Sequence, residues 1–335
     1  IEDFRKDGTL KDIDSIWFGT DDTKKVLPEI LGENRRGILK MGVDSVMPPF
    51  IYMKDGQIVG YEVDLANRIG KRLGYQIELQ DMSFASLIPA LVSSKINFAA
   101  SCIEITPERQ KSMLFTSPTY QGGIVAVVKS SLPEVKASRF ASVKSSAKRT
   151  FADEDRYKLI LQGLGSTIVI SFFSILFGSF LGFGICFLRR SKNKWCSTIA
   201  RVYISIIQGI PILVLLMILF YIIFANVEID AILVAIIAFT LDFAAYAAEM
   251  FRSGIDAVDK GQIEAAGAMG FNRIQTFIKI TLPQALKHIL PVYRGEVIST
   301  IKITSIVGYI AIQDLTKMSD IIRSRTYEAF FPLIS

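Results

Sequence analysis

Few residues in this 335-residue chain have the types and spacing that covalent chemistry requires. The single histidine is His288, and the three cysteines are Cys102, Cys186 and Cys196. Zinc sites need clusters of Cys and His, and nucleophilic hydrolases need a base beside Ser or Cys. Three scattered cysteines provide no disulfide framework either. We therefore expect no catalytic residue and no metal site, and we interpret the cysteines as reduced and structural.

Three ionisable residues lie inside long apolar runs. Asp242 lies in the run 231–251, and Glu296 and Lys302 lie in the run 289–312. A charge at the centre of a membrane span costs at least about 2.5 kcal/mol on insertion scales. Two interpretations remain open. Either the three residues face a polar translocation pathway, or Asp242 meets Lys302 in an ion pair that holds the helices together.

A polar segment between these two apolar runs has a regular pattern. Its fixed residues are Glu264, Ala265, Ala266, Gly270, Ile280, Leu282 and Pro283. We expect a helix through the alanines, a turn at Gly270, and a second helix over 273–280 that ends at Leu282-Pro283. Small side chains permit close approach of another protein, and glycine permits the turn. The pattern predicts a compact helical projection.

Composition places this segment in a chain that is part soluble and part membrane-bound. Half of the residues are apolar and 21% are charged. The net charge of +6 is compatible with nucleic-acid binding, but membrane proteins concentrate Lys and Arg beside their spans for topological reasons. We expect a lipid bilayer and no nucleic acid as partner. The sequence also lacks a Gly-x-x-x-x-Gly-Lys-[Ser/Thr] phosphate loop, so we expect no nucleotide-binding loop of this type in the chain.

The soluble part precedes the membrane part. Apolar spacing that alternates between strand and helix predicts one α/β lobe over 31–130. Its expected strands are 38–43, 75–79, 97–102 and 123–129, and its expected helices are 61–73, 84–91 and 107–111. Residues 1–30 carry a short polar helix pattern. Residues 131–158 form a basic linker that lacks the apolar residues for another lobe.

An all-α transmembrane bundle is expected over 159–335. Its expected spans are 164–188, 199–224, 231–251 and 289–312, with a fifth that starts near Tyr327. The second span is expected to be interrupted at 208–211. The loop 189–194 carries four basic residues, and the loop 225–230 carries two acidic ones. The basic loop is therefore expected in the cytoplasm and the lobe outside the cell, in a multi-pass plasma-membrane protein. Because the chain begins at Ile1 and ends in an apolar run, we interpret it as a fragment.

The patterned segment resembles the signature motif of the membrane subunits of ATP-binding-cassette (ABC) importers. That motif is Glu-Ala-Ala-x3-Gly-x9-Ile-x-Leu-Pro, where x is any residue. Every fixed position of the motif matches over 264–283. Stretches at 208–211, 245–252, 261–266 and 282–285 are similar to permeases for polar amino acids.

This resemblance extends over 153–335 and implies a type I ABC importer permease with five spans. Such a permease works as a homodimer or heterodimer with ABC ATP-binding subunits, which hold ATP and Mg, so no cofactor is expected in this chain. The resemblance also implies that Glu264 faces or braces the groove of the ATP-binding subunit and that Gly270 shapes the projection.

The lobe resembles the first half of the bilobed binding proteins that capture amino acids for these importers. The matching segments are Asp44 with 49–50, 60–65, 82–91 and 105–109. The resemblance implies that Phe84 stacks on the ligand and that Arg109 clamps its carboxylate, with Asp44 and Thr106 as further binding residues. A structural alternative is that Thr106 caps a helix whose first turn contains Arg109.

Three departures favour a lobe that acts as a spacer or docking platform, with a vestigial site. Met47 stands where relatives have an aromatic residue, Cys102 where they have Gly, and Glu104 where they have a carboxylate-binding Thr. The residues after Lys129 lack the material for a second lobe. Residues 1–30 resemble the carboxyl-terminal end of a binding domain, so we expect a complete binding domain upstream.

Together these resemblances imply ATP-driven uptake of a polar amino acid by a permease with a fused substrate-binding domain. The chain is then a transporter subunit and not an enzyme. A ligand-gated channel is an alternative, but it needs a second lobe after the third span. A membrane sensor is another, but it needs an intracellular signalling domain. The pattern over 264–283 favours the importer.

Overall fold

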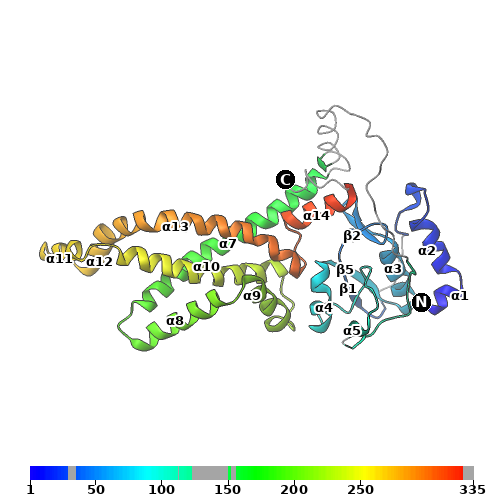
Figure 1. Ribbon diagram of the computed structural model, residues 1–335, viewed down its shortest axis with the longest axis horizontal. Helices are drawn as coiled ribbons and strands as arrows, with labels where there is room; N and C mark the ends of the chain where they lie inside the picture. The colour runs from blue at the N-terminus through cyan, green and yellow to red at the C-terminus, as the bar shows by residue number, and fades with distance from the viewer. Residues whose placement is uncertain (29–34, 112, 123–149, 152–155, 327–335) are drawn as a thin grey trace, which may run out of the picture. The chain divides into compact units, whose positions relative to one another are not determined.

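The computed structural model describes residues 1–28, 35–111, 113–122, 150–151 and 156–326 (Figure 1). The chain divides into two compact units, one of residues 1–161 with 318–335 and one of residues 162–317. The expected strand at 123–129, the fifth span near Tyr327 and most of the linker lie outside the described residues.

The first unit contains a parallel three-stranded sheet in the order β5-β1-β6. Its strands are β1 (Ile38–Val43), β5 (Gln76–Asp81) and β6 (Phe98–Ala99). Helix α3 (Tyr61–Leu73) and helix α4 (Phe84–Val92) connect them, as parallel pairing requires. The bounds predicted for β1 and α3 are confirmed. The strand expected over 97–102 is shorter, because the backbone turns at Cys102, where φ is +49°.

A second, antiparallel sheet was not expected from the sequence. It consists of β2 (Val46–Met47), β3 (Ile51–Lys54) and β4 (Gln57–Val59). Asp55 and Gly56 join β3 to β4 with φ values of 50° and 78°, the left-handed conformations that a tight hairpin turn needs. The Asp-Gly pair was therefore the available sequence signal for this hairpin.

Two amino-terminal helices pack onto this lobe. Helices α1 (Glu2–Lys6) and α2 (Thr9–Trp17) bury their apolar side chains against the second sheet and α3. The shared core contains Phe4, Leu10, Ile13, Trp17, Tyr52, Val59, Tyr61 and Leu65. Within it, the Trp17 indole Nε1 donates to Asp64 Oδ2 at 3.0 Å. Residues 1–18 thus complete the core of the lobe. The origin of the 1–30 segment in an upstream domain stays a prediction.

The second unit is a helical bundle. Its main helices are α7 (Tyr157–Arg189), α8 (Lys194–Gly209), α9 (Ile212–Ile218), α10 (Ala231–Asp256) and α13 (Leu282–Ile303). Helices α7 and α10 are each long and apolar enough to cross a membrane. Two bent pairs also qualify when each is taken as one span: α8 with 212–223, bent by 104°, and 273–310 with 315–324, bent by 62°. The predicted interruption of the second span is confirmed at Ile210, whose extended backbone precedes Pro211.

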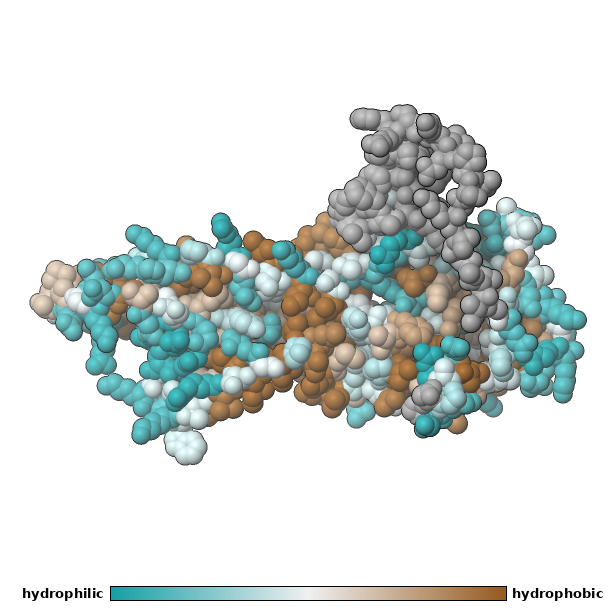
Figure 2. Space-filling view, in the orientation of Figure 1, coloured by the Kyte–Doolittle hydropathy of each residue, from teal (hydrophilic) through white to brown (hydrophobic). Residues whose placement is uncertain are grey.

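Helix α7 packs through small residues and exposes large ones. Its buried positions include Gly163, Thr167, Ser171, Ser174, Gly178 and Gly182, spaced three or four residues apart. A Cβ on Gly182 would lie 2.7 Å from Ala247 Cβ, so α7 and α10 are in close contact. Phe172 and Phe180 are 59% and 72% exposed. Figure 2 shows strongly hydrophobic residues in the middle of the bundle, and a mixture of hydrophilic and weakly hydrophobic residues at the end that carries α11 and α12.

One expected helix end is wrong. Helix α12 (Arg273–Thr276) leads into a π-helical turn (Phe277–Thr281), and α13 begins directly at Leu282, so the helix runs through Leu282-Pro283. Proline is tolerated in the first turn of a helix, and the wider π turn before it changes the backbone hydrogen bonding where the missing N–H falls. The projection is therefore continuous with α13.

Candidate functional site

The projection (259–283) is a helix–turn–helix with well-defined caps. Helix α11 (Lys260–Ala268) begins at Asp259, whose side chain accepts from the Gly261 N–H at 2.6 Å. Gly270 follows α11 with φ of +85°, a left-handed conformation that favours glycine. Asn272 then forms a reciprocal capping box with Gln275, at 2.9 and 3.0 Å. The turn predicted at Gly270 is confirmed.

Most fixed residues of the pattern lie on the surface of the projection. Glu264, Ala265, Gly270 and Pro283 are exposed, Ile280 and Leu282 are half-buried, and Ala266 is buried. Four apolar side chains of the same segment are also exposed: Ile263 (41%), Met269 (68%), Ile274 (70%) and Ile278 (55%). Exposed apolar side chains that gather on one element indicate a protein contact surface. Their role in coupling stays a prediction.

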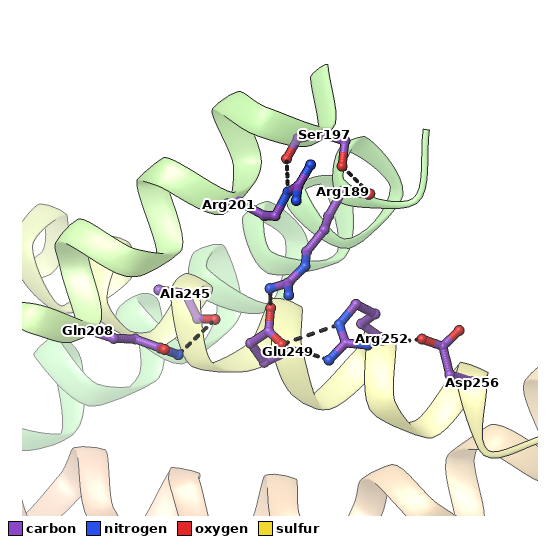
Figure 3. Close-up of polar contacts among 8 residues, drawn as sticks. All are labelled: Arg189, Ser197, Arg201, Gln208, Ala245, Glu249, Arg252 and Asp256. Atoms are coloured by element: carbon purple, nitrogen blue, oxygen red, sulfur yellow. Dashed lines mark hydrogen bonds and ion pairs between the residues drawn. The ribbon is translucent and has the colours of Figure 1, made fainter. Parts of the chain in front are cut away.

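An ion-pair network ties the end of α7 to α10 (Figure 3). Arg252 donates to Glu249 Oε2 through Nε at 3.2 Å and Nη2 at 3.0 Å, and to Asp256 Oδ2 through Nη1 at 3.0 Å. Glu249 also pairs with Arg189, and Asp256 pairs with Arg190. Sequence analysis identified Arg189 and Arg190 only as basic residues of the loop that sets the topology. Each pair is partly exposed and weak alone. The pairs of Arg189 and Arg190 join the end of α7 to α10 at two points, and the two pairs of Arg252 lie within α10.

The candidate pathway residues do not pair as one interpretation expected. Asp242 lies on α10 and Glu296 lies on α13, and these two helices pack together. Lys302 is exposed, and the described residues show no ion pair between it and Asp242. Lys302 is six positions after Glu296, which places their side chains about 120° apart around α13. The ion-pair interpretation is therefore wrong, and the pathway interpretation stays a prediction.

In the lobe, Asp44 and Phe84 come together at the ends of two elements. Asp44 follows β1, and its Oδ2 accepts from the Phe84 N–H at the start of α4, at 2.9 Å. The Ser101 hydroxyl bonds the Asp44 backbone on its other side. Phe84 is 38% exposed, so its ring is accessible at this edge. Asp44 thus positions Phe84 through the backbone.

Arg109 lies beside Phe84 and also takes part in local structure. Its guanidinium carbon is 5.8 Å from the centre of the Phe84 ring, and its Nη1 donates to the Glu104 carbonyl oxygen at 2.9 Å. The Arg109 N–H donates to Thr106 Oγ1 at 3.3 Å, at the start of α5 (Pro107–Gln110). The capping interpretation of Thr106 is confirmed. The structure brings Phe84 and Arg109 together, and ligand binding there stays a prediction.

Sequence reasoning missed a buried carboxyl in this lobe. Glu62 is 9% exposed, and its two oxygens accept from the Cys102 N–H at 2.9 and 3.2 Å. Burial raises the pKa of Glu62, and burial with the nearby Glu62 charge raises the pKa of Cys102 to about 12. Cys102 has a left-handed φ of +49°, which explains physically why glycine suits this position. The described residues contain no group of three or more His, Cys, Asp or Glu that could hold a metal.

Comparisons with known proteins match both parts of the chain. Residues 39–209 match the family of bacterial extracellular solute-binding proteins, family 3. Residues 161–334 match the family described as binding-protein-dependent transport system inner membrane component. The two matches overlap over 161–209, where the structure contains most of α7 and all of α8.

Relatives match the membrane part. The probable amino-acid ABC transporter permease protein YckA of Bacillus subtilis (strain 168) is 36% identical over 175 residues, covering 52% of this chain and 77% of the relative. The putative glutamine transport system permease protein GlnP of Rickettsia bellii (strain RML369-C) is 34% identical over 177 residues, covering 52% and 81%. A crystal structure of an amino acid ABC transporter with histidines is 33% identical with a TM-score of 0.49, covering 58% of this chain and 86% of its own.

The fold agrees with these matches, because an α/β lobe precedes a helical membrane region whose helices are apolar enough to span a bilayer. The inner-membrane-component model covers more than half of the chain, and the relatives exceed 30% identity over more than three quarters of their lengths. This chain therefore belongs to the family of binding-protein-dependent transport system inner membrane components, with a family-3 solute-binding lobe before its membrane helices.

Proposed function

We propose that this chain is the membrane subunit of an ATP-driven ABC importer that takes up a polar amino acid. The relatives bear the names of amino-acid and glutamine permeases, which supports that substrate class. The observation that carries the mechanism is the projection, with its left-handed turn at Gly270 and its exposed apolar side chains. The chain conducts the solute, and ATP hydrolysis belongs to a partner.

The projection seats in a groove of an ABC ATP-binding subunit, which holds ATP and Mg. The continuity between the projection and α13 supports a lever mechanism, because the π turn joins them without a loop. Movement of the ATP-binding subunit then displaces α13 as a unit. Glu296 lies on this helix and Asp242 lies on the neighbouring α10, so the displacement changes access to both.

The remaining partners follow from the same assignment. The chain works in the plasma membrane with a second permease subunit, identical or related, and its lobe lies outside the cell. The contacts of Arg109 with Glu104 and of Thr106 with the α5 backbone support a spacer or docking role for the lobe, because these groups already serve local structure.

Replacement of Gly270 tests the coupling role against a matched neighbour. Both Gly267 and Gly270 have open space around an added Cβ, but only Gly270 has a positive φ. A left-handed residue with a Cβ costs about 1–2 kcal/mol. Gly270→Val is therefore expected to reduce ATP-dependent uptake of labelled glutamine roughly tenfold, since 1.4 kcal/mol corresponds to a factor of ten. Gly267→Val is expected to retain most uptake.

The measurement uses proteoliposomes that contain the complete importer and its ATP-binding subunit. Uptake is competed in turn by each unlabelled amino acid, and competition by one chemical group names the substrate class. Membrane insertion and the thermal stability of both variants serve as controls. Normal uptake by Gly270→Val would contradict the docking role, and ligand-gated ion current without ATP-dependent uptake would contradict the importer itself.

A further inference from the structure

Helix α8 has three faces of different character. Its buried face consists of Ala200, Ile204 and Ile207. Its exposed apolar face consists of Trp195 (79%), Ile199 (63%), Val202 (50%) and Ile206 (54%). Its exposed polar face consists of Lys194, Thr198, Arg201, Ser205 and Gln208. Within each exposed face the residues recur every three or four positions, as they must to share one side of a helix.

The exposed apolar face has the composition of a lipid-facing surface. Trp195 begins it beside the basic loop 189–194, and tryptophan next to Lys and Arg is typical of the boundary between membrane and water. Ile199, Val202 and Ile206 continue it along the helix. The membrane therefore covers this side of α8 from Trp195 onward.

The polar face does not suit lipid. Arg201 is six residues beyond Trp195, and its Nε donates to the Ser197 carbonyl oxygen at 3.4 Å (Figure 3). The described residues give it no acidic partner. An arginine near the membrane boundary can extend to the headgroups. Gln208, however, is 13 residues beyond Trp195, about 20 Å along the axis, and lies beyond such reach.

The polar face of α8 adjoins a polar stretch of α10. The Tyr203 hydroxyl donates to the Leu241 carbonyl oxygen at 2.7 Å, and Gln208 Nε2 donates to the Ala245 carbonyl oxygen at 3.5 Å. Asp242 and Tyr246 are the next residues after these two acceptors, and Tyr246 is 37% exposed. Gln208 thus places the end of the polar face of α8 beside α10, whereas Tyr203 contacts α10 from another side of α8.

We propose that the polar face of α8 lines the translocation passage and that Arg201 contacts the carboxylate of the passing solute. This assignment rests on the proposed importer function and adds a wall of the pathway that neither the motif nor the ionisable residues of α10 and α13 indicated. A guanidinium binds a carboxylate through two parallel hydrogen bonds. Asp242 on the adjoining helix suits the ammonium group of the same zwitterion.

Cysteine scanning tests the face directly. The starting protein is the complete importer in proteoliposomes with Cys102, Cys186 and Cys196 replaced by serine. Single substitutions are then made on the polar face (Thr198→Cys, Ser205→Cys, Gln208→Cys) and on the apolar face (Ile199→Cys, Val202→Cys, Ile206→Cys). Each variant reacts with a charged, water-soluble methanethiosulfonate reagent, and labelling is followed by mass spectrometry.

The polar positions are expected to react at least about tenfold faster than the apolar ones, because the reactive thiolate forms only in contact with water. Transported glutamine is expected to slow labelling at Thr198→Cys and Ser205→Cys, which flank Arg201. Adding Arg201→Gln is expected to remove this protection, whereas Arg201→Lys retains part of it.

Several outcomes would overturn the assignment. Equal reactivity of both faces, or unreactive polar positions, would show that the face is not exposed to a passage. Disulfide cross-linking between two copies at the polar positions would show that it packs against a second subunit. Protection that persists in Arg201→Gln would remove the carboxylate contact. Uptake by the cysteine-free parent tests the importer function separately, because labelling reports on the face whether or not uptake occurs.

Discussion

The α/β lobe and the helical bundle bury opposite kinds of side chain. The lobe buries its large residues, and Trp17, Tyr61 and Met41 are at most 1% exposed. Helix α7 of the bundle buries glycine, serine and threonine and exposes Phe172 and Phe180. Water drives apolar side chains into the core of the lobe, whereas lipid is as apolar as the side chains themselves. Helices in the bundle therefore gain stability from close backbone approach.

Glycine shows the same contrast. In the lobe, Gly56, Gly60 and Gly74 have positive φ values, so glycine is needed for backbone conformation. In α7, Gly178 and Gly182 are helical, and glycine is needed because a side chain would meet α10. Gly56 and Gly74 in the lobe thus serve backbone conformation, whereas Gly178 and Gly182 in α7 serve close contact between helices.

The largest expected loss of stability comes from a substitution that breaks the close contact between α7 and α10. Gly182→Leu inserts a side chain where even a Cβ would lie 2.7 Å from Ala247 Cβ and 2.9 Å from the Ala244 carbonyl oxygen. Overpacking of this kind costs about 3 kcal/mol or more. We expect a marked loss of thermal stability in detergent, with faster amide exchange in both α7 and α10.

Gly184→Leu is the matched control, because nothing lies within 4 Å of a Cβ at that position two residues away. It is expected to leave stability near that of the parent. Equal destabilisation by the two substitutions would mean that helix propensity, and not contact with α10, decides the role of glycine in α7.

A smaller loss of stability is expected from two substitutions in the lobe. They distinguish a glycine needed only for its positive φ from one that also leaves no room for a Cβ. Gly60 has φ of +139°, and a Cβ there would clash with the Phe50 carbonyl group, whereas Gly56 has φ of +78° and open space. Gly56→Ala is expected to cost only the left-handed strain, about 1 kcal/mol. Gly60→Ala is expected to cost roughly 3 kcal/mol, because a backbone clash adds to the strain.

Hydrogen exchange of the α3 and β3 amides in the whole protein measures both free energies of opening. A Gly60→Ala protein that is no less stable than the Gly56→Ala protein would show that the chain between Phe50 and Gly60 can shift without cost. The contrast between conformation and contact would then not hold inside the lobe.

The smallest expected effect concerns pH and is confined to the lobe. Burial raises the pKa of Glu62 above its usual 4.5, so the folded lobe binds this proton more tightly than the unfolded chain does. Protonation of Glu62 therefore stabilises the folded lobe. This contribution to the free energy of unfolding is complete below pH 4.5 and is lost as the pH rises through the raised pKa of Glu62 in the folded state. We expect the free energy of opening, measured by hydrogen exchange of the Cys102 amide, to be lower at neutral pH than at pH 4.5.

Glu62→Gln removes the titrating group and keeps an acceptor for the Cys102 N–H, so this pH dependence is expected to disappear. The ion-paired helices of the bundle provide an internal reference, because Glu62 does not act on them. An unchanged pH profile in Glu62→Gln would assign the dependence to another group.

Much of the secondary structure could be predicted from local pattern. The bounds of β1 and α3, the break at Pro211 and the turn at Gly270 follow from periodicity, proline and glycine. The antiparallel β2-β3-β4 sheet was missed because its strands are two to four residues long, too short to show alternation. The continuation through Pro283 was missed because a π turn leaves no signature in residue spacing.

The sequence identified which residues belong to the candidate sites better than it predicted which of them are in contact. Sequence patterns identified Phe84 with Arg109 and Asp242 with Glu296 as functional candidates. The structure places Arg109 beside the Phe84 ring, and it places Asp242 and Glu296 on two helices that pack together. The expected contact of Asp242 with Lys302 was wrong, because their distance depends on the rotation of α13 against α10. The polar face of α8 was overlooked because its residues are individually ordinary.

The sequence by itself determined the division into a lobe and apolar helices, the projection and its resemblance to a coupling element, because these depend on neighbouring residues. Only the tertiary structure decided which helix faces are buried and which groups pair, as with Arg190 and Asp256, 66 positions apart. Such pairs form when packing brings distant residues together, and no local spacing encodes the distance between them.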